Sequence, residues 1–132
     1  MKILIAGEGG QGIQTIAQVL ARAAFREGKN TLYIPNFGVE QRGGASIAFL
    51  VIDKNPVVYP KFEKADVLAT LSERVKDQVK KYQGPKTKII SDKDNLSVLK
   101  KILNLTQIVE KETLKKVLEE KLGAKLKTEV PI

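Results

Sequence analysis

The chain has 132 residues, enough for one domain with a buried core, and we expect a single domain over residues 1–132. It contains no cysteine and no histidine, which excludes a structural zinc site, a disulfide, a thiolate or imidazole catalyst and thiolate ligation of an iron–sulfur cluster. The net charge is +8, but most lysines follow residue 75, interleaved with acidic residues at helical spacings, so we expect solvated helices and no nucleic-acid binding.

The composition also bears on location. We find no run of 18 apolar residues and no charged-then-apolar leader, so we expect no membrane association and a cytoplasmic protein. Many Lys and Glu residues, one Met and no Cys are typical of a heat-adapted protein.

The first element is an apolar run, Ile3–Ala6, that predicts a strand covered on both faces. A glycine turn with the spacing G-x-G-x-x-G follows at residues 7–12 and opens a helix. In this motif the first glycine permits a tight turn, the second lets a ligand approach the backbone, and the third lets helix and strand pack closely. Free amide groups at the helix start suit an anion or a partner chain. The candidate binding residues here are Gly7, Gly9, Gly10, Gln11 and Gly12.

A helix and a second strand complete the first unit. Apolar residues from Ile13 to Ala24 recur at helical spacing, and Gly28 is placed to cap the helix in the left-handed conformation. Residues 31–34 predict the second strand, and the three elements together have the size of a parallel strand–helix–strand unit. A dinucleotide-binding domain would place an acidic residue at the end of that strand. The chain reads Pro35-Asn36-Phe37 instead, which weakens an NAD-binding interpretation.

A glycine-rich loop follows, and two interpretations of it remain open. Its glycines can serve only to turn the chain while its two charged residues are solvated. A flexible backbone beside an arginine also suits a carboxylate or phosphate group. The candidate binding residues of this loop are Gly38, Glu40, Arg42, Gly43 and Gly44.

The rest of the chain predicts further strands and helices around the same sheet. We expect strands at 46–52, 57–59, 65–71 and 88–90, the second pairing back on the first as an antiparallel hairpin at the sheet edge, and the last lying in the core. Helices are expected at 73–82, capped by Ser72, and within 95–103 and 114–122. The predicted fold is an α/β, three-layer, Rossmann-like domain with a mostly parallel sheet and helices on both faces.

Two motifs at matching separation give the chain a resemblance to a known family. Residues 7–12 match G-x-G-G-Q-G, and residues 35–44 match P-x-[YF]-G-x-E-x-R-G-G, both typical of the gamma subunit or gamma domain of 2-oxoacid:ferredoxin oxidoreductases, the pyruvate:ferredoxin oxidoreductase group. The similarity extends over most of the chain. Family members usually carry a longer stretch between the strand at 88–90 and the helix that follows.

The resemblance implies a non-catalytic subunit that helps to form the thiamine and coenzyme A pocket of an enzyme converting a 2-oxo acid to an acyl-CoA. It implies alpha, beta and delta partner subunits, with ferredoxin as electron acceptor. Thiamine diphosphate, Mg²⁺ and [4Fe-4S] clusters would sit on those partners, with none bound by this chain alone. Arg42 would bond an anionic group, with Glu40 holding it in place. The alternative is a free-standing nucleotide- or phosphate-binding module that uses the same glycine turn.

Overall fold

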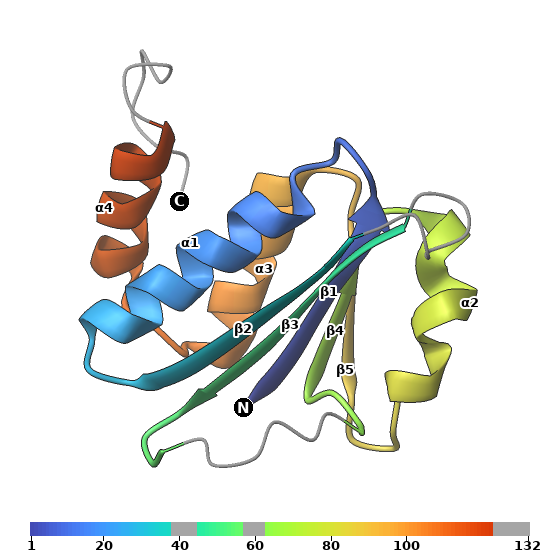
Figure 1. The fold of residues 1–132 in the computed structure, drawn as a ribbon, viewed down its shortest axis with the longest axis horizontal. Coiled ribbons are helices and arrows are strands. Elements are labelled where there is room, and N and C mark those ends of the chain that lie inside the picture. The colour runs from blue at the N-terminus through green and yellow to red at the C-terminus, as the bar shows by residue number, and fades with distance from the viewer. Residues whose placement is uncertain (38–44, 57–62, 123–132) are drawn as a thin grey trace.

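Five strands form one sheet in the order β2-β3-β1-β4-β5. The computed structural model describes residues 1–37, 45–56 and 63–122. Figure 1 shows the sheet with helices on either side of it. The strands are β1 (Lys2–Glu8), β2 (Asn30–Phe37), β3 (Ala45–Asp53), β4 (Val67–Thr70) and β5 (Lys88–Ser91). The helices are α1 (Ile13–Arg26), α2 (Lys76–Val79), α3 (Asn95–Thr106) and α4 (Lys111–Leu122), and two 3-10 turns, η1 (Glu73–Val75) and η2 (Lys80–Tyr82), flank α2.

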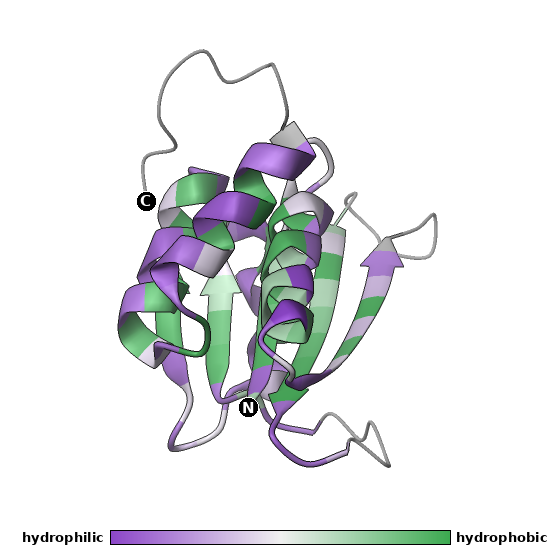
Figure 2. Cartoon of the chain, turned by 90° about the vertical axis from the view of Figure 1, so that its left-hand side faces the viewer, coloured by the Kyte–Doolittle hydropathy of each residue, from purple (hydrophilic) through white to green (hydrophobic). Residues whose placement is uncertain are grey.

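The predicted three-layer arrangement is confirmed. One face of the sheet packs against α1, α3 and α4, and the other packs against the short helical segment from η1 to η2 (Figure 1). Alternate residues of β1 point to the two faces, so Ile3 and Ile5 join the first cluster while Leu4 and Ala6 join the second. All four are fully buried, as the apolar run predicts. Figure 2 shows the strands behind the helices as mainly hydrophobic.

The prediction of a mostly parallel sheet is only partly correct. β1 pairs with β4, and β4 with β5, in parallel, but β3 runs antiparallel to both of its neighbours, β1 and β2. The strands β1 and β2 therefore point the same way, as α1 requires, with β3 inserted between them. Since β3 is apolar on both faces along almost its whole length, it suits a central position in either direction. The predicted arm at 57–59 lies outside the described residues, and the antiparallel edge is formed by β2 and β3.

Two further predictions differ in detail. The strand at 88–90 lies at the sheet edge instead of in the core, so Ile90 is buried while Ile89 is 49% exposed. The helix predicted over 73–82 is helical throughout but consists of one α-helical turn between two 3-10 turns. Only Val75 and Val79 of this segment are buried, which leaves little apolar surface to hold a long regular helix against the sheet. Ser72 caps it as expected, with its hydroxyl accepting the Arg74 N–H.

Candidate functional site: the carboxyl edge of the sheet

The glycine turn lies at the carboxyl end of β1 and leads directly into α1. Gly10 and Gly12 adopt φ values of 88° and 77°, a region that side chains other than glycine rarely enter. Gly12 is the N-cap residue of α1, and no side chain of the described residues caps this end of the helix. The first amide groups of α1 therefore have no side-chain partner in the part of the chain that the structure describes.

Two glycines of the turn allow close packing within the chain. A Cβ on Gly7 would lie 2.6 Å from Cδ1 of Ile13 and 2.7 Å from Oε1 of Gln11. A Cβ on Gly12 would lie 2.4 Å from Nδ2 of Asn95, at the start of α3. The first glycine thus makes the close approach to α1 that the sequence motif assigns to the third, and the third packs against a different helix.

Gln11 is a structural link at this edge. Its Oε1 accepts the Glu8 N–H at 2.7 Å, and its Nε2 donates to the Leu71 carbonyl at 3.1 Å. These bonds hold the glycine turn against the chain that follows β4. Both ends of the amide are engaged, so Gln11 holds the turn in place, and the binding role expected for it from the sequence stays a prediction.

The second motif is attached to the same edge. In the sheet register Glu8 lies opposite Ala45, and Phe37 lies opposite Ser46. The chain therefore leaves β2 and enters β3 beside the end of β1, where the glycine turn begins. The five candidates of this motif, Gly38, Glu40, Arg42, Gly43 and Gly44, lie outside the described residues.

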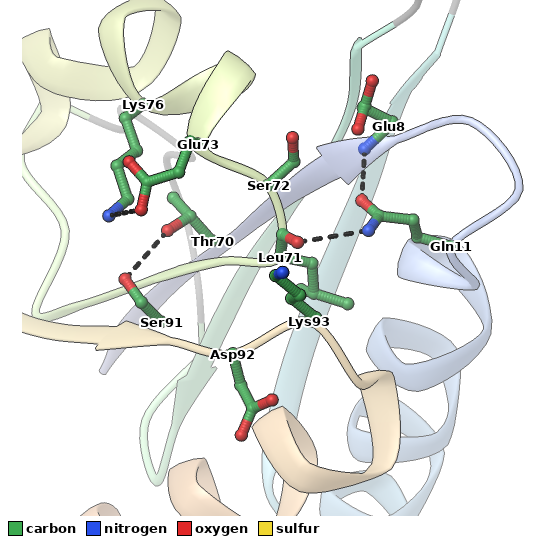
Figure 3. A pocket seen from close by; sticks show the side chains of 10 residues that line it. All are labelled: Glu8, Gln11, Thr70, Leu71, Ser72, Glu73, Lys76, Ser91, Asp92 and Lys93. Carbon is green, nitrogen blue, oxygen red and sulfur yellow. Dashed lines mark hydrogen bonds and ion pairs between the residues drawn. The ribbon is translucent and has the colours of Figure 1, made fainter.

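A cavity of about 490 Å³ opens at the same edge, between the carboxyl ends of β1, β4 and β5 (Figure 3). Its lining includes Gln11 from the glycine turn, Thr70 and Ser72 from the end of β4, and Ser91 and Lys93 from the end of β5. Apart from Gln11, sequence reasoning missed these residues. The available signal was the polar side chains that come directly after apolar strands, which gather at one edge once the strand order is known.

Charge at the cavity is set by ion pairs and hydrogen bonds. The Lys101 ammonium, 3.0 Å from an Asp92 carboxylate oxygen, and the Asp94 N–H hold the pKa of Asp92 below its ordinary value. Asp92 is therefore ionised at neutral pH. Across the described ranges 1–37, 45–56 and 63–122 we find no group of acidic side chains arranged to hold a metal ion. Within the same ranges no helix is long and apolar enough to cross a membrane.

Comparison with known proteins agrees with the resemblance noted in the two glycine motifs. The family model for pyruvate ferredoxin/flavodoxin oxidoreductase matches residues 2–102, which is more than half of the chain and includes both motifs. The chain belongs to this family.

Individual members of the pyruvate ferredoxin/flavodoxin oxidoreductase family give the extent of the similarity. The chain is 40% identical over 87 residues to the pyruvate/ketoisovalerate oxidoreductases common subunit gamma of Thermococcus kodakarensis, covering 65% of this chain and 47% of that subunit. It is 30% identical over 151 aligned positions to the 2-oxoglutarate synthase subunit KorC of Methanocaldococcus jannaschii, covering 89% of this chain and 81% of KorC.

A solved family structure shares the fold. The 2-oxoglutarate:ferredoxin oxidoreductase from Magnetococcus marinus, with 2-oxoglutarate, coenzyme A and succinyl-CoA bound, superposes with a TM-score of 0.80 at 22% identity, over 96% of this chain and 28% of that one. The chain spans about half the length of several curated relatives that it matches. The alignment with KorC is longer than this chain, so KorC carries inserted residues that this chain lacks.

Proposed function

We propose that this chain is a non-catalytic gamma subunit of a cytoplasmic 2-oxoacid:ferredoxin oxidoreductase. The enzyme would convert a 2-oxo acid and coenzyme A to an acyl-CoA and carbon dioxide, with ferredoxin accepting the electrons. Membership of the family and the relatives named as gamma subunits support this assignment. The proposed partners are the alpha, beta and delta subunits.

The residue types present agree with a division of labour between subunits. A chain without cysteine offers no thiolates for a [4Fe-4S] cluster, and the described residues offer no acidic cluster for Mg²⁺. The thiamine diphosphate, its metal ion and the clusters would therefore be held by the other subunits, where they supply the decarboxylation and electron-transfer chemistry. This chain would contribute binding and shielding from water, and none of its residues would need to transfer a proton.

The observation that carries the proposal is the shared position of the two glycine motifs. The glycine turn and both attachment points of residues 38–44 meet at the ends of β1, β2 and β3. In the complex, this edge would face the coenzyme A side of the pocket. The free amide groups at the start of α1 and the Arg42 guanidinium would then bind an anionic group of the coenzyme or of the partner chain.

The Arg42→Ala variant tests this role in a complex reconstituted from all subunits. A lost charge-assisted hydrogen bond is worth about 1.5–3 kcal/mol, so we expect KM for coenzyme A to rise by roughly tenfold or more. The matched control is Arg26→Ala, which removes an arginine that pairs with Glu120 at the far end of α1. We expect the control to leave KM unchanged. If Arg42→Ala left both KM and kcat at wild-type values, Arg42 would have no part in the pocket.

A further inference from the structure

The cavity at the carboxyl edge occupies a topological switch point of the sheet. From β1 the chain crosses through α1 on one face toward β2, whereas from β4 it crosses through α2 on the other face toward β5. The strands β1 and β4 are parallel neighbours, so their connections diverge and leave a crevice between them. In open α/β sheets, small ligands bind in such crevices. The volume of about 490 Å³ is in the range of small-molecule sites.

The carboxylates around this cavity are each neutralised by a neighbouring cation. Glu8 pairs with Arg74 at 3.0 Å, Glu73 pairs with Lys76 at 2.8 Å, and Asp92 pairs with Lys101 at 3.0 Å. In Figure 3 the Asp92 carboxylate points away from the other lining side chains. This pairing removes most of the negative charge that would otherwise repel an anion.

One cation of the lining stays without such a partner. Within the described ranges Lys93 forms no ion pair, although it lies directly beside Asp92 in the sequence. The lining itself carries three carboxylates and two ammonium groups. When Arg74 and Lys101, which lie outside the lining, are counted with the carboxylates that they pair with, Lys93 is left as the one lining charge without a counter-charge among the described residues. An anion bound beside Lys93 would therefore be attracted by its ammonium group.

Hydroxyl groups in the lining of the same cavity supply hydrogen-bond donors. The Thr70 and Ser91 hydroxyls lie 3.2 Å apart and share one hydrogen bond, which uses only one of their two hydrogens. The Ser72 hydroxyl accepts from the Arg74 N–H and keeps its own hydrogen for another acceptor. Thr70 is only 3% exposed, so its position is fixed by packing.

We propose that this cavity binds a small metabolite through a terminal oxyanion group, with Lys93 supplying the charge and the Thr70, Ser72 and Ser91 hydroxyls supplying the hydrogen bonds. The site goes beyond the proposed subunit role, because it uses the β1–β4 crevice and does not involve Arg42. A phosphate monoester and a carboxylate share this chemistry, and the experiment distinguishes them.

Calorimetric titration of the full chain tests the site, with AMP as the phosphate monoester and succinate as the carboxylate. We expect one of the two to bind with a Kd below about 1 mM, and Lys93→Ala to raise that Kd by about tenfold. The matched control is Lys86→Ala, an exposed lysine before β5 at the opposite edge of the sheet, which should change the Kd by less than about twofold.

A second variant tests the role of the Thr70 and Ser91 hydroxyls without changing the charge of the cavity. The double variant Thr70→Val/Ser91→Ala removes both partners of one hydrogen bond, so the fold should persist, and we expect weaker binding by about tenfold. Arg42→Ala should leave this Kd unchanged, which separates the site from the proposed coenzyme A contact. The proposal is overturned if neither probe binds at about 10 mM, or if Lys93→Ala and Lys86→Ala alter binding equally.

Discussion

The two ends of α1 use the same residue type for different purposes. At the C-terminal end, Gly28 adopts φ 81° and completes a closed cap, with its N–H donating to the Phe25 carbonyl and the Lys29 N–H donating to the Ala24 carbonyl. At the N-terminal end, Gly12 adopts a similar φ of 77°, but no side chain within residues 1–37, 45–56 and 63–122 caps the helix. One end thus satisfies its polar groups internally, whereas no described side chain binds the first amide groups at the other.

The surroundings of the two ends of α1 also differ, since one end is bonded to another helix of the chain and the other lies at the carboxyl edge of the sheet. Directly before Gly28, the Glu27 carboxylate accepts the Glu110 N–H at 2.7 Å, which fastens the end of α1 to the start of α4. Beyond Gly12, the turn reaches the sheet edge where residues 38–44 leave and rejoin the sheet. A positive-φ glycine is therefore no evidence of a binding site by itself, since Gly28 serves only to end a helix.

The largest expected effect comes from a side chain at Gly12. Gly12→Ala combines a left-handed conformation with a Cβ 2.4 Å from Nδ2 of Asn95, a flexible side chain that would have to shift, so we expect a loss of about 1–2 kcal/mol in the free energy of unfolding, measured with denaturant. Gly28→Ala meets no atom within 4 Å and should cost about 1 kcal/mol, from its conformation alone.

A double variant separates the two contributions at Gly12. In an Asn95→Ala background the contact is absent, so Gly12→Ala should then cost only about 1 kcal/mol, the same as at Gly28. An undiminished cost in that background would show that the packing against α3 contributes nothing, and the two ends of the helix would then differ less than the structure indicates.

A smaller effect is expected from Glu27 at the closed end. Burial raises the pKa of this carboxyl, but hydrogen bonds from the Glu110 N–H, Thr113 and Lys29 outweigh it and hold the pKa below its ordinary value. A group with a lowered pKa stabilises the fold above its unfolded pKa, near 4.3 for Glu, and the stabilisation is lost as the pH falls through the folded value. We expect Glu27→Gln to cost about 1 kcal/mol at pH 7 and less at pH 3, by denaturant unfolding at each pH.

The control for this prediction is Glu120→Gln on the same helix pair. Glu120 pairs with Arg26 on the surface, where an ion pair is worth little, so we expect a smaller loss of stability at pH 7 than for Glu27→Gln. Equal losses for the two variants, or a Glu27→Gln loss that grows toward pH 3, would contradict the assigned role of Glu27.

The local parts of the fold could be predicted from the sequence, and the pairing of distant strands could not. The apolar run of β1, the stripe of α1 and its stop at Gly28 depend on neighbouring residues, and all three predictions are confirmed. The insertion of β3 between β1 and β2 depends on contacts far apart in the sequence. A strand buried on both faces carries no signal for its direction or its neighbours.

The site could be predicted only where a motif is continuous in the sequence. The glycine turn was found from its spacing, but the engagement of both ends of the Gln11 amide depends on Leu71, sixty residues later. The cavity joins the ends of three strands, so Thr70, Ser91 and Lys93 come together only once the strand order is known. For Gly38, Glu40, Arg42, Gly43 and Gly44, a binding role stays a prediction from the sequence.

The most direct test of a binding role for the glycine turn compares Gly10→Ala with Gly28→Ala in the reconstituted complex. The two glycines have similar φ values, 88° and 81°, and a Cβ on either would meet no atom of the described residues within 4 Å beyond its immediate neighbours, so the two variants should be equally stable. If a partner or coenzyme lies against the glycine turn, Gly10→Ala will weaken subunit assembly or raise KM for coenzyme A by about tenfold, while Gly28→Ala will leave both unchanged. Identical assembly and identical kinetics for the two variants would contradict the account.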